Sequence, residues 1–437
     1  MTTNNPAPRS RIVVLNRWSD GFAAYHRYID HAANNVAYIC TPNGAAALDT
    51  SQTAHVEELS DILDEDALHK AMTSCQAALG GIDRLIALSE FDLLKAARLR
   101  NSFNIPGDLH DTVVRFRDKA VMKHTVAAAG LRVPRVAALE DVAFAKANSS
   151  PVMRFPIIVK PRTAAASLDV RLIDTRTRLD MLWPTLPLVE YECEEYIEGP
   201  VYHVDGFVRD NTWVIARVSR YINTRLQFAQ GKPLGSVMLD PGPLNDAVLE
   251  FAAACLKALA LSNGPFHLEI IGACDGFYFL EVGARVGSGE IPFLFHELYG
   301  VDLFDLWVTH QSGDEARFAA RAQAASVAST SPTRGGFLML PEPVGKIFVD
   351  AQLPNAIPGL YEAIFPVRRH LFNGSRRSSN ILARFRYRGA SEEEIDRAIR
   401  ATLRDFRYTL AESVGSPNSS TDDITLRDGF KRVHRGC

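Results

Sequence analysis

Two acidic side chains stand in adjacent apolar segments separated by a short turn. Glu269 lies within FHLEII, and Glu281 lies within FLEVGARVGSGEIP. The link at 274–276 predicts a hairpin, and a three-residue loop sets Glu269 directly opposite Glu281 with Cβ atoms about 5 Å apart. A two-residue loop would place the two acids diagonally. Facing carboxylates repel each other unless a cation lies between them, so the hairpin predicts a cation site.

A divalent cation is the simplest partner for this carboxylate pair. Mg²⁺ prefers a few carboxylates together with phosphate oxygens and water. Arg285 follows Glu281 by four residues, and its fork of donors suits a phosphate or a carboxylate. The glycine-containing segment at 286–290 offers N–H groups that can approach an anion closely. The alternative is a surface hairpin whose acid is shielded by Arg285, which the apolar neighbours of both acids disfavour.

Two lysines and a segment between two strands suit a nucleotide. Lys160 ends the apolar run IIVKPR, where its ammonium could reach phosphates or extend to water. Lys119 opens a helix, a position where most lysines are solvated. The stretch LVEYECEEYIEGPVYHVDG at 188–206 predicts a hinge whose backbone could bind an adenine edge, with Glu194 accepting from the exocyclic amine. The alternative for this stretch is a charged edge strand.

These residues must be positioned by two kinds of sheet. Alternating strands and helices in the N-terminal part indicate a parallel, Rossmann-like sheet, although no GxGxxG follows the first strand. Later strands, including those around the hinge and the hairpin, indicate antiparallel sheets. The expected strands are 11–16, 36–42, 82–90, 155–162, 336–340 and 381–387. The expected helices are 21–33, 60–75 with Ser60 as a possible cap, 91–100, one from 118 stopped by Gly130, 245–261 and 391–407. The expected polar segments are 1–10, a linker at 319–333 and a tail at 413–437.

Composition limits the classes of function. The chain has 437 residues, 47% hydrophobic and 23% charged, which is typical of a globular protein with two or three domains. A net charge of −3 and a pI near 6.5 give no overall basic field for nucleic acid or anionic lipid. Arginine clusters at 366–380 and 385–389 are interpreted as solvated faces rather than as a nucleic-acid patch.

Cysteine usage and hydropathy predict a cytoplasmic protein with reduced thiols. None of the six cysteines forms a CxxC pair or a zinc-like spacing. The first residues, MTTNNPAPRSR, lack the apolar core of a signal peptide. No apolar run approaches the ~20 residues of a membrane helix.

In this order the motifs resemble the ATP-grasp superfamily of carboxylate–amine ligases. The order is a Rossmann-like pre-domain, a DKxxxK helix, the VKP lysine, the ExEEYIEG hinge, a VDG strand and LE…LEVGAR, spanning roughly 11–313. The combination is specific, whereas each motif alone is not. The chain looks most like the L-amino-acid ligases that join two amino acids into a dipeptide. Biotin carboxylase and purine-pathway enzymes share the core but match less well.

The resemblance implies an α/β (α+β) chain with the ATP-grasp fold. An N-terminal Rossmann-like pre-ATP-grasp domain would occupy 11–115, and a C-terminal α+β subdomain 334–412. The ATP-grasp domain at 116–318 would divide into a small lobe at 125–200 and a large lobe at 200–318.

The resemblance also implies roles for individual residues. Glu269 and Glu281 would hold Mg²⁺, or Mn²⁺ in its place. Arg285, which would steady an acyl phosphate, and Lys160 would be catalytic. Residues implied to bind ATP are Lys119 and Lys160 at the phosphates, Glu194, Glu195, Tyr196 and Ile197 at the adenine, and Asp205 on the nucleotide side. Candidates for substrate contact are His203, His267, Gly287 and Ser288, although a single histidine is more often structural.

Two positions depart from the superfamily pattern. The third metal position of E-x-N-x-R is Gly283, where water would replace a side-chain ligand. The phosphate loop after the VKP lysine, usually glycine-rich, is TAAASLDV at 163–170, and alanine adopts a positive φ less readily than glycine. These departures motivate a rival interpretation, a nucleotide-binding protein that has lost catalysis.

The expected activity is ATP-dependent ligation of a carboxylate to an amine through an acyl phosphate, with release of ADP and phosphate. The expected partners are small amino-acid-like carboxylates and amines, with no nucleic acid and no membrane, and the resemblance suggests a homodimer. The rival enzymes are an ATP-grasp carboxylase and a purine-type ligase.

Overall fold

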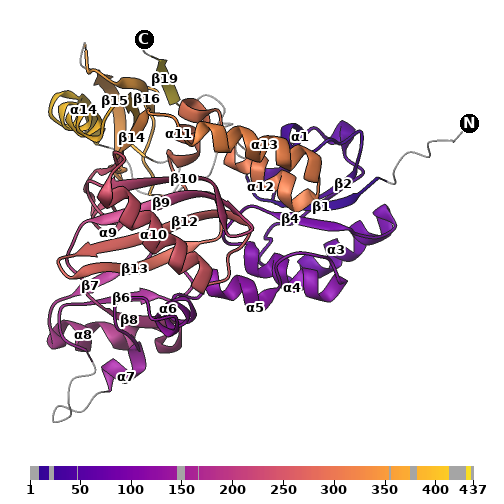
Figure 1. Ribbon diagram of the computed structural model, residues 1–437, viewed down its shortest axis with the longest axis horizontal. Coiled ribbons are helices and arrows are strands. Elements are labelled where there is room, and N and C mark those ends of the chain that lie inside the picture. The colour runs from indigo at the N-terminus through magenta and orange to yellow at the C-terminus, as the bar shows by residue number, and fades with distance from the viewer. Residues whose placement is uncertain are drawn as a thin grey trace, which may run out of the picture.

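Three large sheets organise the protein (Figure 1): a parallel one, a four-stranded antiparallel one and a nine-stranded one. The computed structural model describes residues 9–18, 24–46, 48–144, 153–165, 167–353, 356–374, 381–412 and 430–434. Most of the polar segment at 1–10, and the tail except 430–434, lie outside these ranges. Among the helices in these ranges, none combines the length and the apolar character that crossing a bilayer needs.

The N-terminal sheet is parallel, as the alternation of strands and helices predicts. Its strand order is β3-β2-β1-β4. Val13 and Leu15 pack under α3 and α4, whereas Ile12 and Val14 pack with α12, because side chains alternate along a strand. The elements are β1 (Arg11–Asn16), α1 (Tyr25–Tyr28), β2 (Asn35–Cys40), α2 (Pro42–Ala45), β3 (His55–Glu58), α3 (Glu65–Leu79), β4 (Arg84–Ala87), α4 (Leu93–Phe103) and α5 (His110–Val113).

Three local predictions in this part need correction. Within the described residues, the helix expected at 21–33 is only the single turn α1. The helix expected from Ser60 begins at Glu65, because the side chain of Asp64 accepts a backbone hydrogen bond and caps it. The edge strand β3 was not predicted, since its four half-exposed residues carry no apolar alternation.

A four-stranded antiparallel sheet within the predicted small lobe lies at the bottom of Figure 1, and it is called the small-lobe sheet below. Its strand order is β5-β8-β6-β7. Ile157, Val159 and Cys193 pack with α7 and α8 on one face, so the intervening side chains of the same strands point to the other face. The elements are α6 (Lys119–Ala128), β5 (Val136–Ala138), α7 (Leu139–Ala143), β6 (Ile157–Pro161), β7 (Arg171–Ile173), α8 (Arg176–Leu182) and β8 (Tyr191–Glu195).

The large sheet has nine strands, in the order β13-β12-β9-β10-β11-β14-β17-β16-β19. Strands of the predicted subdomain at 334–412 continue this sheet, because β14 pairs with β11 of the predicted large lobe. The described part of the predicted tail is the edge strand β19, not a free polar segment. The strands are β9 (Val201–Arg209), β10 (Thr212–Tyr221), β11 (Leu234–Met238), β12 (Gly264–Ala273), β13 (Gly276–Gly283), β14 (Arg334–Leu340), β16 (Leu360–Pro366), β17 (Ala383–Gly389) and β19 (Phe430–His434), and a separate pair is β15 (Lys346–Gln352) with β18 (Arg407–Glu412).

Helices pack on the large sheet and join it to the N-terminal sheet. Val248 and Ala252 of α10 share a core with β9 and β12. The linker expected at 319–333 is largely helix α13, whose buried Phe318 and Ala325 belong to the core that also contains β1, and its alanines favour a helix over a linker. The helices are α9 (Arg225–Ala229), α10 (Pro243–Ala258), α11 (Ile291–Tyr299), α12 (Leu303–Ser312), α13 (Glu315–Ala328) and α14 (Glu392–Asp405).

The arginine cluster at 385–389 is not a solvated face. Arg386 on β17 is 1% exposed, lies 2.5 Å from Glu290 and also pairs with Glu297. Its guanidinium stands 4.0 Å from the ring centroid of Phe293. The carboxylates of Glu290 and Glu297 thus supply the negative charge that a buried guanidinium needs. In the other cluster, residues 375–380 lie outside the described ranges.

Candidate functional site

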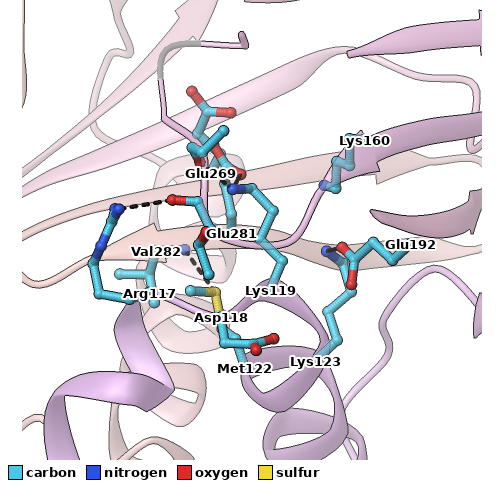
Figure 2. Close-up of polar contacts among 12 residues, drawn as sticks. Arg117, Asp118, Lys119, Met122, Lys123, Lys160, Glu192, Glu269, Glu281 and Val282 are labelled. Carbon is cyan, nitrogen blue, oxygen red and sulfur yellow. Dashed lines mark hydrogen bonds and ion pairs between the residues drawn. The ribbon is translucent and has the colours of Figure 1, made fainter. Parts of the chain in front are cut away.

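A cavity of about 260 Å³ lies between the small-lobe sheet and the β12–β13 end of the large sheet. Lys119 approaches the cavity from α6 and Lys160 from the small-lobe sheet, whereas Glu269 and Glu281 come from the large sheet (Figure 2). The predicted residues that line the cavity are Lys119, Lys160, Glu194, Glu195, Tyr196, Ile197, Glu269 and Glu281.

Glu269 and Glu281 are cross-strand partners on β12 and β13, as predicted. The predicted loop was wrong, however, because Ala273 pairs with Gly276 across a two-residue turn. That turn alone would set Glu269 opposite Leu280. The register shifts between Glu269 and Ile270, and this β-bulge brings Glu281 into place. Two oxygen-donor side chains therefore face one cavity, and this donor set fits Mg²⁺.

Glu269 is held by one group from its own strand β12 and by one from β10. Its carboxylate accepts a hydrogen bond of 3.1 Å from the hydroxyl of Tyr221 on β10, and its Oε1 lies 3.4 Å from Nε2 of His267. Burial would raise the pKa of Glu269, but the interaction with His267 and the charge of Arg225 lower it to about 2. Glu269 is thus an anion at neutral pH and ready to bind a cation.

Lys119 approaches this pair from α6. It is the first residue of α6, whose N-cap Asp118 accepts from two backbone N–H groups. Its Nζ lies 3.8 Å from Glu281 Oε2 and donates to the carbonyl oxygen of Ala164. The cap therefore fixes the start of the helix where Lys119 points between the two lobes.

Lys160 and Glu194 form a buried ion pair on the cavity side of the small lobe. Their Nζ and Oε1 atoms are 2.7 Å apart. Lys123 of α6 donates to the same Glu194 oxygen and lies 3.8 Å from Glu192. Burial alone would lower the pKa of Lys160, but Glu194 and Glu281 raise it. An adenine amine would therefore compete with two ammonium groups for Glu194.

The hinge and the phosphate loop both border the cavity. The chain leaves the small-lobe sheet after Glu195 and enters the large sheet at Val201, so the predicted hinge does connect two sheets. In the loop at 163–170 the left-handed positions are taken by Ser167 (φ 54°) and Asp169 (φ 55°). Asp169 accepts a hydrogen bond from the hydroxyl of Tyr191, which holds the loop conformation without glycine.

Asp205 lies behind the cavity rather than in its lining. It is 2% exposed, with Oδ2 2.5 Å from His203 Nδ1 and Oδ1 2.8 Å from His267 Nδ1. Burial opposes the anion, yet both histidines hold the pKa of Asp205 below its usual range. His203 Nε2 also lies 2.7 Å from the hydroxyl of Ser236. Both histidines are thus held inside the protein, and a role for either in substrate contact stays a prediction.

Gly287 packs against this buried cluster, whereas Ser288 is exposed. A Cβ on Gly287 would lie 2.3 Å from Asp205 Oδ1, so the backbone here must pass without a side chain. Gly287 therefore lies beside Asp205, and Ser288 faces solvent. Contact of either residue with substrate stays a prediction.

Arg285 reaches across to the N-terminal domain. Its Nε lies 2.7 Å from Glu90, just after β4, and Glu90 also lies 2.5 Å from Arg117. Burial would raise the pKa of Glu90, but these two guanidinium groups lower it to about 2. A Cβ at Gly283 would come within 3.2 Å of Arg285 Cγ and 3.4 Å of its Nε. The departure from asparagine at Gly283 thus makes room for the arginine stem.

Several residues of the site were missed by sequence reasoning. Lys123 had a signal, because it follows Lys119 by four residues and shares its helix face. Arg225, which lines the cavity next to Tyr221, follows Thr224, which forms a capping box with Gln227. Glu90 had no local signal, since it is far from Arg285 in the sequence.

Comparison with known proteins agrees with this geometry. No protein-family model matches the chain. The chain is 25% identical over 264 residues to an L-arginine-specific L-amino acid ligase of Bacillus subtilis, covering 57% of this chain and 62% of the relative. The match thus spans less than two thirds of that relative's length.

Solved structures match over nearly the whole chain. An L-amino acid ligase from Bacillus licheniformis superposes with a TM-score of 0.71 at 16% identity, covering 92% of this chain and 99% of that one. A biotin carboxylase domain of a Hydrogenobacter thermophilus 2-oxoglutarate carboxylase, in complex with MgADP and bicarbonate, gives a TM-score of 0.64 at 14% identity, covering 92% and 91%. The chain therefore has the ATP-grasp fold of these solved structures, and its sequence is similar to that of an L-amino acid ligase.

Proposed function

We propose that the protein joins the carboxylate of one small amino-acid-like substrate to the amine of another, using ATP and releasing ADP and phosphate. The observation that carries this proposal is the pairing of Glu269 with Glu281 across a cavity from Lys119 and Lys160. Carboxylates for a metal and ammonium groups for phosphates then face each other across one space. The sequence relationship to an L-amino acid ligase supports the choice of carboxylate and amine.

The first step is attack of the substrate carboxylate on the γ-phosphorus of ATP. The bond from that phosphorus to the β–γ bridging oxygen breaks, and ADP leaves with its electron pair. Mg²⁺ held by Glu269 and Glu281 would bind phosphate oxygens and offset their charge. Lys119 and Lys160 supply fixed positive charge on the opposite side of the cavity. Positioning and charge are the main requirements of such a transfer.

The second step is attack of a neutral amine on the acyl phosphate. The C–N bond forms, phosphate leaves from the same carbon, and the amine proton passes to a base or to solvent. Arg285 is suited to hold the acyl phosphate, because Glu90 fixes its Nε and the carbonyl oxygen of Val286 accepts from its Nη1, so that the guanidinium is held in place. Water must be excluded during this step, and the loop at 163–170 borders the cavity where a cover is needed.

The test is ADP release from MgATP with single amino acids and with all pairs from a panel, followed by mass spectrometry of the products. We expect ADP only with particular pairs, together with a product whose mass is the sum of the two substrates minus water. Bicarbonate-dependent ADP release would instead favour the carboxylase alternative. Tight MgATP binding with no turnover on any pair, or with bicarbonate, would favour a protein that has lost catalysis.

Two features of the structure favour an active enzyme over that last alternative. The loop at 163–170 reaches left-handed conformations through Ser167 and Asp169, so its lack of glycine does not prevent its fold. Gly283 accommodates Arg285 instead of merely lacking a ligand. Both departures from the superfamily pattern thus have a structural compensation.

A further inference from the structure

Lys123 is a buried cation for which the proposed reaction has no use. It is the second lysine of the DKxxxK pattern, one helical turn after Lys119 on α6, and its side chain is 1% exposed. Figure 2 shows it rising from α6 toward Glu192, beside the strand that carries Lys160. A lysine is almost never buried without a partner, so its partner indicates what it does.

That partner is Glu194, which already pairs with Lys160. Lys160 Nζ lies 2.7 Å from Glu194 Oε1, and Lys123 donates to the same oxygen. Glu192 lies 3.8 Å from Lys123, and burial raises the pKa of its carboxyl group. Two lysines therefore share one oxygen of Glu194, and all three side chains are buried.

This sharing of Glu194 matters when a nucleotide arrives. To bind a phosphate, Lys160 must exchange Glu194 for a phosphate oxygen. If Lys160 were the only partner of Glu194, that exchange would leave a buried carboxylate without compensation, which is strongly unfavourable. With Lys123 in place, the exchange leaves a neutral Lys123–Glu194 pair behind.

We propose that Lys123 is a positioning residue for ATP: it neutralises Glu194 and so leaves Lys160 free to bind the phosphates. The inference rests on the proposed function, since it needs a nucleotide in the cavity. Lys123 acts by pairing with Glu194 when Lys160 leaves it, and it does not contact ATP. A purely structural role would be the burial of one more ion pair under α6.

The test is calorimetric binding of MgATP, without amino acids, to full-length variants. We expect Lys123→Met to raise the Kd for MgATP about tenfold or more, because Glu194 then holds Lys160. The double variant Lys123→Met/Glu194→Gln should bind within about threefold of Glu194→Gln alone, since no buried anion remains to neutralise. Lys123→Arg should keep the wild-type Kd, and Lys257→Met, at an exposed site on α10, is the matched control.

Each outcome separates this inference from the function it rests on. If the wild type does not bind MgATP, the proposed function fails. If the wild type binds and Lys123→Met binds equally well, only the role of Lys123 fails. The inference is also overturned if the double variant binds MgATP much more weakly than Glu194→Gln alone, because Lys123 would then act other than through Glu194. If Lys123→Met does not fold, the comparison of the double variant with Glu194→Gln decides by the same criterion.

A split between kinetic constants gives a second readout. Lys123→Met should raise the KM for ATP while kcat at saturating ATP changes by less than about threefold, because Lys160 is restored to the phosphates once ATP is in excess. A fall in kcat with an unchanged KM would contradict the proposed exchange.

Discussion

Glu90 and Arg285 join the N-terminal domain to the candidate site, with Arg285 Nε 2.7 Å from the Glu90 carboxylate. Glu90 follows β4 of the parallel sheet, and Arg285 follows β13 of the large sheet. Glu90 is also paired with Arg117, next to α6. One partly buried carboxylate thus fixes the arginine with respect to the helix that begins with Lys119.

Replacing Glu90 by glutamine should loosen Arg285 without removing it. We expect kcat for amide formation to fall about tenfold or more, because Arg285 no longer has a charged anchor for its Nε. The Kd for MgATP should change by less than about threefold, since Arg285 does not line the nucleotide cavity. Steady-state kinetics and calorimetry measure both values. Equal losses in kcat and ATP affinity would contradict a separate role for this pair.

Glu281→Gln should leave the fold intact and abolish ADP formation. The exposed fraction of the Glu281 side chain is 34%, so glutamine can replace it without the cost of burying an unpaired polar group. An amide, however, cannot offer the metal a charged oxygen. We expect kcat to fall at least about 100-fold, with an unchanged circular dichroism spectrum and melting temperature. Glu250→Gln, on α10, is the control for loss of a carboxylate elsewhere. Wild-type ADP release by Glu281→Gln would remove the metal-site interpretation.

Lys160→Ala should weaken the binding of ATP more than the binding of the amino-acid substrates. A charge-assisted hydrogen bond contributes about 1.5–3 kcal/mol, so the Kd for MgATP should rise about tenfold to a hundredfold. Calorimetry with ATP and with each amino acid provides the comparison. An ATP affinity equal to that of the wild type would show that Lys160 does not reach the phosphates.

The pH dependence of stability should report on Glu192. Burial raises its folded-state pKa from 4.5 to about 8, so between these pH values the folded protein holds a proton that the unfolded chain has released. The contribution of Glu192 to the free energy of unfolding therefore falls as pH rises from about 4.5 to about 8, and then levels off. Glu192→Gln cannot release this proton, so its advantage in unfolding free energy over the wild type should grow from pH 5 to pH 8. Parallel curves for the two proteins in denaturant titrations would contradict the raised pKa.

The hairpin illustrates how a correct prediction can rest on an incomplete reason. Alternation of side chains and the position of Gly276 were enough to expect Glu269 opposite Glu281. The turn has two linking residues and the register is restored by a bulge at Leu280. Bulges depend on how a strand twists against its neighbours, here β12 against both β9 and β13, and a local pattern does not contain that information.

The expected linker and tail form regular structure for a similar reason. Residues 319–333 and 413–437 contain serine, threonine and proline, which favour irregular chain. Ala325 is nevertheless buried in α13, and Phe318 of the same helix packs on Phe207 of β9 and His310 of α12. β19 is a strand because the edge of β16 offers it a partner. Partners distant in sequence decided both segments.

The sequence by itself determined the parallel N-terminal sheet and placed Lys160, Glu269 and Glu281 in apolar strands, because strand and helix periods and charged residues within apolar runs are local properties. The division into two lobes and the roles of these residues and of Lys119 were implied by the resemblance and stay predictions. Only the tertiary structure decided that Asp205 is locked between two histidines, that Glu194 is shared by two lysines and that Arg285 is anchored by Glu90. Those pairings depend on which buried charges meet across separate sheets, and a buried charge is stable only beside its partner.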